Sequence, residues 1–268
     1  MAWRGYEFRA VASALMPASL GGMAESGYGP NVPPGTGATL EAGYRRPMSE
    51  PRAPVPRPAA VIFDLDGTLV DTVEARIKAW LAVFGEEEIP ADRRQVAALI
   101  GTDGRHLARE VASAAGITLE PGRDESIDAR CGAIFAELNR SPKPLPGVHD
   151  LVRRLEAAGV PWAIATSSRR EQVAASVDAL KLDRPPLIID GTHVEHAKPA
   201  PDLLLLAAHE LHTDPARCWY VGDATWDVLA ASAAGMVAVG VTSGVADAAT
   251  LLGAGARRVV ASLAELEV

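Results

Sequence analysis

Hydrophobic and polar positions along residues 58–268 predict short strands separated by helices. Short apolar runs have the length of buried strands, and the stretches between them carry apolar residues at helical spacing. The predicted strands are AAVIF, PWAIAT, PLIID, CWYVG and VAVGV. The predicted helices are HDLVRRLEAAG, SRREQVAASVDALK, PDLLLLAAHEL and TWDVLAASAAG. This repetition predicts an α/β fold in which helices cover both faces of a parallel sheet.

The segment between Val73 and Pro144 does not follow this alternation. It has no convincing strand pattern, but it contains the amphipathic stretches VEARIKAWLAVFG, ADRRQVAALIG, GRHLAREVASAAG and DESIDARCGAIFAELNR. We therefore predict a helical insertion that begins just after VIFDLDGT and ends at SPKPLPG. An insertion at this point would lie above the carboxyl end of the first strand, where open parallel sheets bind ligands.

The first 57 residues are rich in Gly and Pro and show little hydrophobic periodicity. Such a composition buries too little apolar surface to order a chain, so residues 1–57 are predicted to be a disordered tail. Met48 would make a natural start shortly before the first strand. Residues 1–47 are then a wrongly assigned start, a flexible tail, or a Pro-rich ligand for a partner.

Charge and cysteine content narrow the range of partners. The net charge is −8, from 34 acidic against 26 basic residues, which argues against nucleic acid or an anionic membrane as a partner. A small anionic ligand remains possible because it needs only a local positive site. Cys131 and Cys218 fit neither a zinc site nor a disulfide framework, and we expect both to be buried. With no apolar run of membrane-spanning length, a cytoplasmic location is expected.

The first predicted strand runs directly into two acids, Asp64 and Asp66, in VIFDLDGT. Alternate positions of an extended segment face the same side, so the two carboxylates would lie close together and repel each other. The segment is therefore either a solvated strand end or a site that holds a cation. Gly67 gives the backbone the freedom to turn after them.

Three further segments place polar side chains where a phosphate site would need them. An attacking carboxylate and a phosphate dianion repel each other, so such a site requires a hard cation, a fixed positive charge and hydrogen-bond donors. Thr166 ends the strand in IATSS, and Lys198, one of four lysines, precedes a helix in AKPAPD. Asp223 lies at the strand end in CWYVGDATWD, followed four residues later by Asp227. Asp227 is either a supporting acid at the metal or a helix N-terminal charge.

The segments DLDGTLVDT, ATSS, KPAPD and GDATWD, in this order, resemble the four motifs of the haloacid dehalogenase superfamily. The resemblance covers about residues 59–268, and the helical insertion is similar to that of the capped, phosphoglycolate phosphatase-like branch. It implies a Rossmann-like catalytic core over residues 58–73 and 145–268, with a helical cap over residues 74–144. It also implies a magnesium-dependent phosphatase that acts on a small phosphorylated metabolite through a phosphoaspartyl intermediate.

By the same resemblance, Asp64 is the nucleophile, while Asp66 protonates the leaving oxygen and later activates water. Asp64 and Asp223 would be side-chain ligands of Mg²⁺, with Asp66 contributing its backbone carbonyl and Asp227 standing behind them. Lys198 would hold the phosphoryl oxygens.

Thr166 would share that phosphoryl-binding role, and the neighbouring Ser167 is an alternative for it. In the cap, Arg105 is a candidate for substrate binding, with a solvated helix-face arginine as the alternative. Thr166 is otherwise a strand-end hydroxyl with its hydrogen bonds satisfied locally.

Other functions of this superfamily remain as alternatives. A dehalogenase would not need Asp66, and a phosphonatase would need a cap lysine, for which only Lys78 and Lys143 are available. Sugar phosphomutases share all four motifs, but Arg76 replaces the histidine of their DTxEYHxxAW segment, which favours hydrolysis. A non-catalytic module that senses phosphate or binds a partner is the last alternative. The sequence indicates no oligomeric state.

Overall fold

The computed structural model describes residues 55–268. The predicted tail therefore falls outside the described residues, apart from its last three positions. Every described residue belongs to one compact unit, so the predicted boundaries between core and cap remain a prediction. No helix within this part of the chain is long and apolar enough to cross a membrane.

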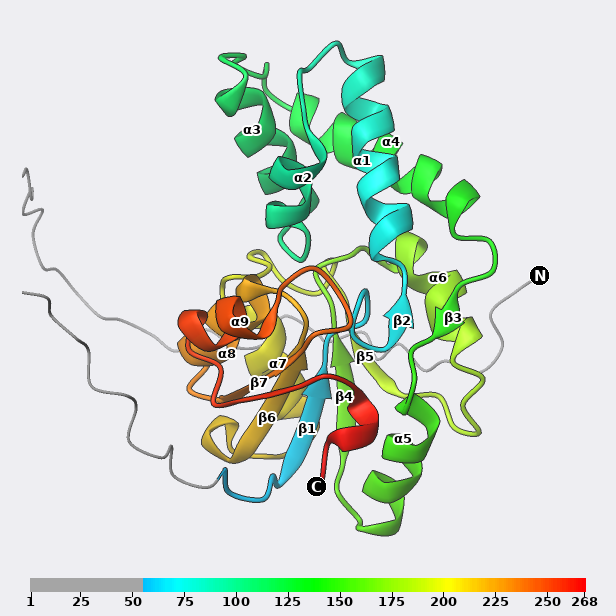
Figure 1. Cartoon of the computed structure of the whole chain (residues 1–268), viewed down its shortest axis with the longest axis vertical. Coiled ribbons are helices and arrows are strands. Elements are labelled where there is room, and N and C mark those ends of the chain that lie inside the picture. Colours follow the sequence, from blue (N-terminus) through cyan, green and yellow to red (C-terminus); the bar gives the residue numbers. More distant parts are fainter. Residues whose placement is uncertain (1–54) are drawn as a thin grey trace, which may run out of the picture. The chain divides into compact units, whose positions relative to one another are not determined.

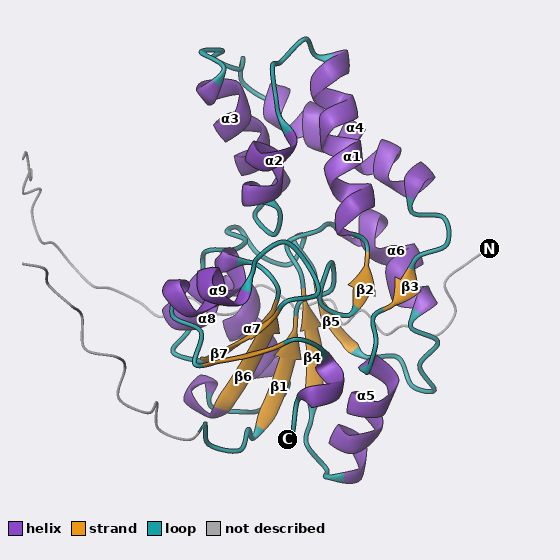
Figure 2. Cartoon of the chain, in the orientation of Figure 1, coloured by secondary structure: helices purple, strands orange, loops and turns teal. Residues whose placement is uncertain are grey.

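A six-stranded parallel sheet forms the centre of the core, in the order β5-β4-β1-β6-β7-β8 (Figure 2). Its strands are β5 (Leu187–Ile189), β4 (Trp162–Ala165), β1 (Ala60–Phe63), β6 (Cys218–Gly222), β7 (Val237–Val241) and β8 (Arg258–Val260). Five of them correspond to the predicted strands, which confirms the α/β class. Because β1 has β4 on one side and β6 on the other, the chain winds outward from it in both directions. Its carboxyl end is therefore a topological switch point, where such sheets bind ligands.

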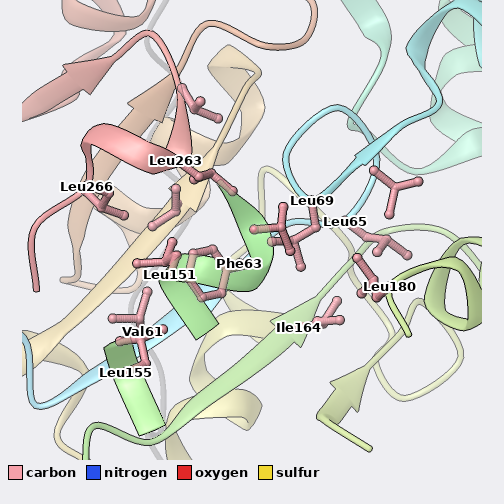
Figure 3. Packing of buried hydrophobic residues seen from close by; sticks show 14 of the residues in the cluster. Val61, Phe63, Leu65, Leu69, Leu151, Leu155, Ile164, Leu180, Leu263 and Leu266 are labelled. Carbon is pink, nitrogen blue, oxygen red and sulfur yellow. The ribbon is translucent and has the colours of Figure 1, made fainter. Parts of the chain in front are cut away.

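Helices cover both faces of the sheet. They are α5 (Val148–Ala157), α6 (Arg170–Ala179), α7 (Asp202–Glu210), α8 (Thr225–Ala233) and α9 (Ala248–Ala254), and the short 3-10 turns are η1 (Pro215–Arg217) and η2 (Leu263–Glu265). Along β1, Val61 and Phe63 pack with α5, α6 and η2, as Figure 3 shows in part. Ala60 and Ile62 pack with α7, α8 and α9 on the other face. Since both faces of β1 are buried, all of its residues are apolar, and its sequence shows a continuous apolar run.

The insertion between β1 and β4 consists of α1 (Val73–Glu86), α2 (Arg93–Leu99), α3 (Gly104–Ala114) and α4 (Arg123–Leu138) (Figure 1). It has its own apolar cluster, in which Ile77, Trp80 and Val83 of α1 pack with Ile127 and Phe135 of α4. The insertion is thus a small helical layer with an interior of its own, as the predicted cap requires.

Two short strands tie the ends of the insertion together. β2 (Val70–Asp71) pairs in antiparallel fashion with β3 (Lys143–Pro144), so the chain enters and leaves the insertion at neighbouring positions. The prediction that no strand lies between Val73 and Pro144 was wrong at its last two residues, which form β3. Two residues are too few to show a period in the sequence, and Pro144 is a poor strand former.

Candidate active site

The loop after β1 carries Asp64 and Asp66 into a buried position, with exposed fractions of 3% and 9%. The chain turns sharply at Gly67, whose φ is +82° and whose N–H donates to the Val70 carbonyl at 2.8 Å. A Cβ on Gly67 would lie 2.6 Å from Oδ2 of Asp223. The glycine is therefore required both by the left-handed conformation and by the close approach of a carboxylate.

Lys198 lies at the centre of the predicted residues. Its Nζ donates to Oδ1 of Asp64 and to Oδ1 of Asp227, both at 2.7 Å, and its side chain is 1% exposed. Burial opposes the charged form, but the carboxylates of Asp227 and Asp64 raise the pKa of Lys198 well above its ordinary value. The lysine is thus a fixed positive charge beside the predicted nucleophile.

Three buried carboxylates converge beside this lysine. Asp64, Asp223 and Asp227 each offer one oxygen, and these atoms lie within 4.8 Å of one another. Burial, and to a smaller extent repulsion by the neighbouring acids, raises the pKa of Asp64 to about 7 and that of Asp223 well above its ordinary value. One lysine does not balance three carboxylates. An all-oxygen donor set with excess negative charge fits a hard divalent cation such as Mg²⁺.

The carboxylates of Asp223 and Asp227 also accept hydrogen bonds from neighbouring groups of the core. Asp223 accepts from the Thr68 hydroxyl at 3.1 Å and from the Val245 N–H at 2.9 Å. Asp227, in the first turn of α8, accepts from the Ala224 N–H at 2.9 Å, so it is a helix N-terminal acid as well as a partner of the lysine. The helix N-terminal reading of Asp227 describes its contact with Ala224, and its part as a supporting acid at the metal stays a prediction.

Asp66 is bound by a different set of donors, which the sequence did not reveal. The Thr72 hydroxyl donates to its Oδ1 at 2.6 Å, while Arg76 and the Ser168 hydroxyl donate to its Oδ2 at 2.7 and 3.0 Å. Burial works against ionisation, but Arg76 and the hydroxyl donors lower the pKa of Asp66 below its ordinary value. A signal did exist: Thr72, Arg76 and Trp80 recur every four residues and so share one helix face.

Arg76 comes from helix α1 of the cap and reaches into the core. Its Nη1 also donates to Oε1 of Gln172 at 3.2 Å, and its guanidinium carbon lies 3.5 Å from the centre of the Phe135 ring. The side chain is 8% exposed. A cap residue therefore contacts the predicted acid and base directly.

The other predicted residues lie at the edges of the site. Thr166 is buried at the end of β4, and its Oγ1 accepts from the Ser168 N–H at 3.2 Å. Ser167 donates instead to the Gly101 carbonyl of the cap at 3.1 Å. Arg105 pairs with Asp103 at 3.2 Å and keeps 39% of its side chain exposed.

A cavity of about 340 Å³ lies between the cap and the carboxyl end of the sheet. Of the predicted residues, its lining includes Asp64, Asp66, Arg105, Thr166, Ser167, Lys198 and Asp223. Asp227 does not line it and stands behind Lys198. The structure thus gathers these seven predicted residues around one cavity that is large enough for a small molecule.

The fold has an α/β core with an inserted helical layer, and a buried lysine lies among carboxylates at the switch point. These features are those expected of a capped hydrolase with an α/β core. Residues 61–241 match the family model of haloacid dehalogenase-like hydrolases, so the chain belongs to this family. This confirms the resemblance drawn from the four motifs.

Relatives with known names support this assignment. The chain is 36% identical to phosphoglycolate phosphatase 1 of Pseudomonas aeruginosa over 195 residues, which covers 70% of each protein. It is 33% identical to the fructose-1-phosphate phosphatase YqaB of Escherichia coli over 186 residues, covering 69% of this chain and 97% of that protein. A hydrolase from Pseudomonas syringae superposes with a TM-score of 0.74 at 32% identity, covering 77% of this chain and 94% of that structure.

Proposed function

We propose that the protein is a magnesium-dependent phosphatase that hydrolyses a small phosphorylated metabolite through a phosphoaspartyl intermediate on Asp64. The observation that carries the proposal is the position of Asp64, buried against Lys198 and open to the cavity. The two named relatives act on phosphoglycolate and on fructose 1-phosphate, which are both small phosphate esters.

In the first step, an oxygen of Asp64 attacks phosphorus, and the bond from phosphorus to the leaving oxygen breaks. Lys198 offsets the repulsion between the carboxylate and the phosphate dianion, because its charge is fixed 2.7 Å from Oδ1 of Asp64. Thr166 and the backbone N–H groups after β4 would orient the phosphoryl oxygens. When bound by Asp64 and Asp223, Mg²⁺ would supply further positive charge to the same oxygens.

Asp66 transfers one proton in each of the two steps. Because Arg76 and the hydroxyl donors lower the pKa of Asp66, it must take up a proton when the substrate binds, and as an acid it then donates this proton to the departing alcohol oxygen. The resulting carboxylate is the base that takes a proton from the water that attacks the phosphoaspartate. Arg76, Thr72 and Ser168 position its carboxylate, since all three donate to it. Inorganic phosphate and the regenerated Asp64 carboxylate are the products of the second step.

The proposal is tested with Asp64→Asn and with p-nitrophenyl phosphate as the substrate. We expect kcat to fall by about 10³-fold or more, because the nucleophile is lost, while the circular dichroism spectrum stays unchanged. The matched control is Asp71→Asn, the same change at an exposed position seven residues further on, which should retain activity. Wild-type turnover should stop in EDTA and return with Mg²⁺.

Three results would overturn the proposal. Full activity of Asp64→Asn would exclude the covalent route, and an inactive wild type would favour a non-catalytic module. A phosphomutase would be indicated by transfer of the phosphoryl group to a second hydroxyl of a sugar phosphate without release of inorganic phosphate.

A further inference from the structure

The cations that line the cavity are already paired with carboxylates that also line it. Among the described lining residues, four side chains are cationic. The four pairs are Lys198 with Asp64 at 2.7 Å, Arg76 with Asp66 at 2.7 Å, Arg105 with Asp103 at 3.2 Å, and Arg169 with Asp128 at 3.4 Å. These eight side chains therefore carry as many negative as positive charges.

Two further acids, Asp223 and Glu195, also line the cavity. A divalent cation at the carboxylate cluster would balance two negative charges, and the phosphoryl group would be received there together with Lys198. No excess of positive charge then remains among the described lining residues to receive a second anionic group on the substrate.

Asp128 makes the cap side unfavourable for such a group. It lies on α4 and is 7% exposed, and a Cβ added to Gly104 would come within 2.0 Å of its Oδ1, so the cap backbone approaches the carboxylate closely. Burial, together with the nearby Asp103 carboxylate, raises the pKa of Asp128. A third negative charge at this place would be repelled by both acids.

We propose that the cavity selects phosphate esters of neutral polyhydroxy alcohols, and that Asp128 is the residue that disfavours leaving groups with their own negative charge. The inference rests on the proposed phosphatase function. Hydroxyl groups would donate to the carboxylate of Asp128 and accept from the side-chain amide of Gln172, which lines the same space and hydrogen-bonds to Asp128 in the free protein. A carboxylate or a second phosphate on the leaving group would have to break an existing ion pair to find a cation.

The experiment compares two esters that differ in charge but hardly in size, 2-hydroxyethyl phosphate and 2-phosphoglycolate. For the wild type with Mg²⁺, we expect kcat/KM to be about tenfold or more higher for the neutral ester, since like charges brought together in a site disfavour binding. Fructose 1-phosphate and fructose 1,6-bisphosphate form a second pair, in which the anionic ester is also larger, and they should show the same order.

Asp128→Asn assigns the preference to one residue. It keeps the shape of the side chain and removes its charge, while Arg169 keeps its ion pair with Glu125 at 3.1 Å. We expect the ratio of kcat/KM for the neutral over the anionic ester to fall by about tenfold, mainly through faster turnover of 2-phosphoglycolate. The matched control is Glu125→Gln, on the same helix and 3.1 Å from Arg169, but 59% exposed and outside the cavity lining. That control should keep the wild-type ratio.

Equal or better turnover of 2-phosphoglycolate by the wild type would overturn the inference, even if Asp128→Asn failed to fold. An unchanged ratio in a folded Asp128→Asn variant would also overturn the role of this residue. If p-nitrophenyl phosphate is hydrolysed without preference between the paired esters, the proposed function stands and this inference fails. If no ester is hydrolysed, the proposed function fails and the inference fails with it.

Discussion

Replacement of Lys198 by methionine removes a buried charge and keeps most of the volume of the side chain. The ammonium group donates to Asp64 and Asp227, both at 2.7 Å, so the variant leaves these two carboxylates and Asp223 buried without their lysine. We expect the change to lower both the rate of hydrolysis and the stability of the metal-free protein.

The magnitudes follow from the contact distances. At 2.7 Å, two unit charges attract each other by about 6 kcal/mol at an effective dielectric constant of about 20, and desolvation of the buried ammonium opposes part of this. Removal of one partner of a buried ion pair destabilises a protein by about 3–5 kcal/mol. A loss of about 3 kcal/mol in the transition state corresponds to about a hundredfold lower kcat/KM.

Two assays test these values, namely hydrolysis of p-nitrophenyl phosphate and urea denaturation in EDTA. In Mg²⁺ the loss of stability of Lys198→Met should be smaller, since a cation bound by the same carboxylates would replace part of the lost positive charge. Lys78→Met is the matched control, because Lys78 is 61% exposed and pairs with Glu74 at the surface, where ion pairs contribute about 0–1 kcal/mol. A decrease in kcat/KM of less than tenfold for Lys198→Met would refute the argument that this charge offsets the repulsion of phosphate.

Two more predictions concern the loop after β1 and the first cap helix. Asp66→Asn should lose about 10²- to 10⁴-fold more activity on an alkyl phosphate than on p-nitrophenyl phosphate in single-turnover phosphorylation, because only the alkoxide needs an acid. With the aryl ester, this variant should accumulate added phosphate mass on the peptide that contains Asp64, and equal losses on both esters would contradict the role. Gly67→Ala should destabilise the protein by more than about 1 kcal/mol in urea denaturation, because of its φ of +82° and the contact with Asp223. Gly85→Ala, in a helix with open space around the new methyl group, should instead stabilise by about 0.5–1 kcal/mol, and equal effects would count against this reasoning.

The residues at the ends of the central strands could be located from the sequence, because strand ends are visible there. β1, β4 and β6 have apolar runs that stop at Asp64, Thr166 and Asp223, and parallel strands bring their carboxyl ends to one edge. Helix α9 and strand β8 were not predicted. β8 is three residues long, begins with an arginine and forms the edge of the sheet, so its pattern is too weak to detect.

The contacts between cap and core could not be predicted in the same way. The pairing of Arg76 with Asp66 and of Asp128 with Arg169 depends on how two separately packed layers meet. Periodicity gives the buried face of each helix, but it does not give the angle at which the layer approaches the sheet. A buried arginine on an otherwise apolar helix face was nevertheless a sign that a carboxylate faces it from another element.

The pairing of β2 with β3 would allow the cap to be replaced during evolution. Because the chain enters and leaves the cap at neighbouring positions, a different helical layer could be inserted between the same two strands with little change in loop-closure entropy. Under the proposed function, a change of cap would alter the preferred substrate and leave the proposed nucleophile Asp64 in place. The exchange has one constraint: the cap supplies Arg76, so a transplanted cap that lacks this arginine leaves Asp66 with the Thr72 and Ser168 hydroxyls as its side-chain donors.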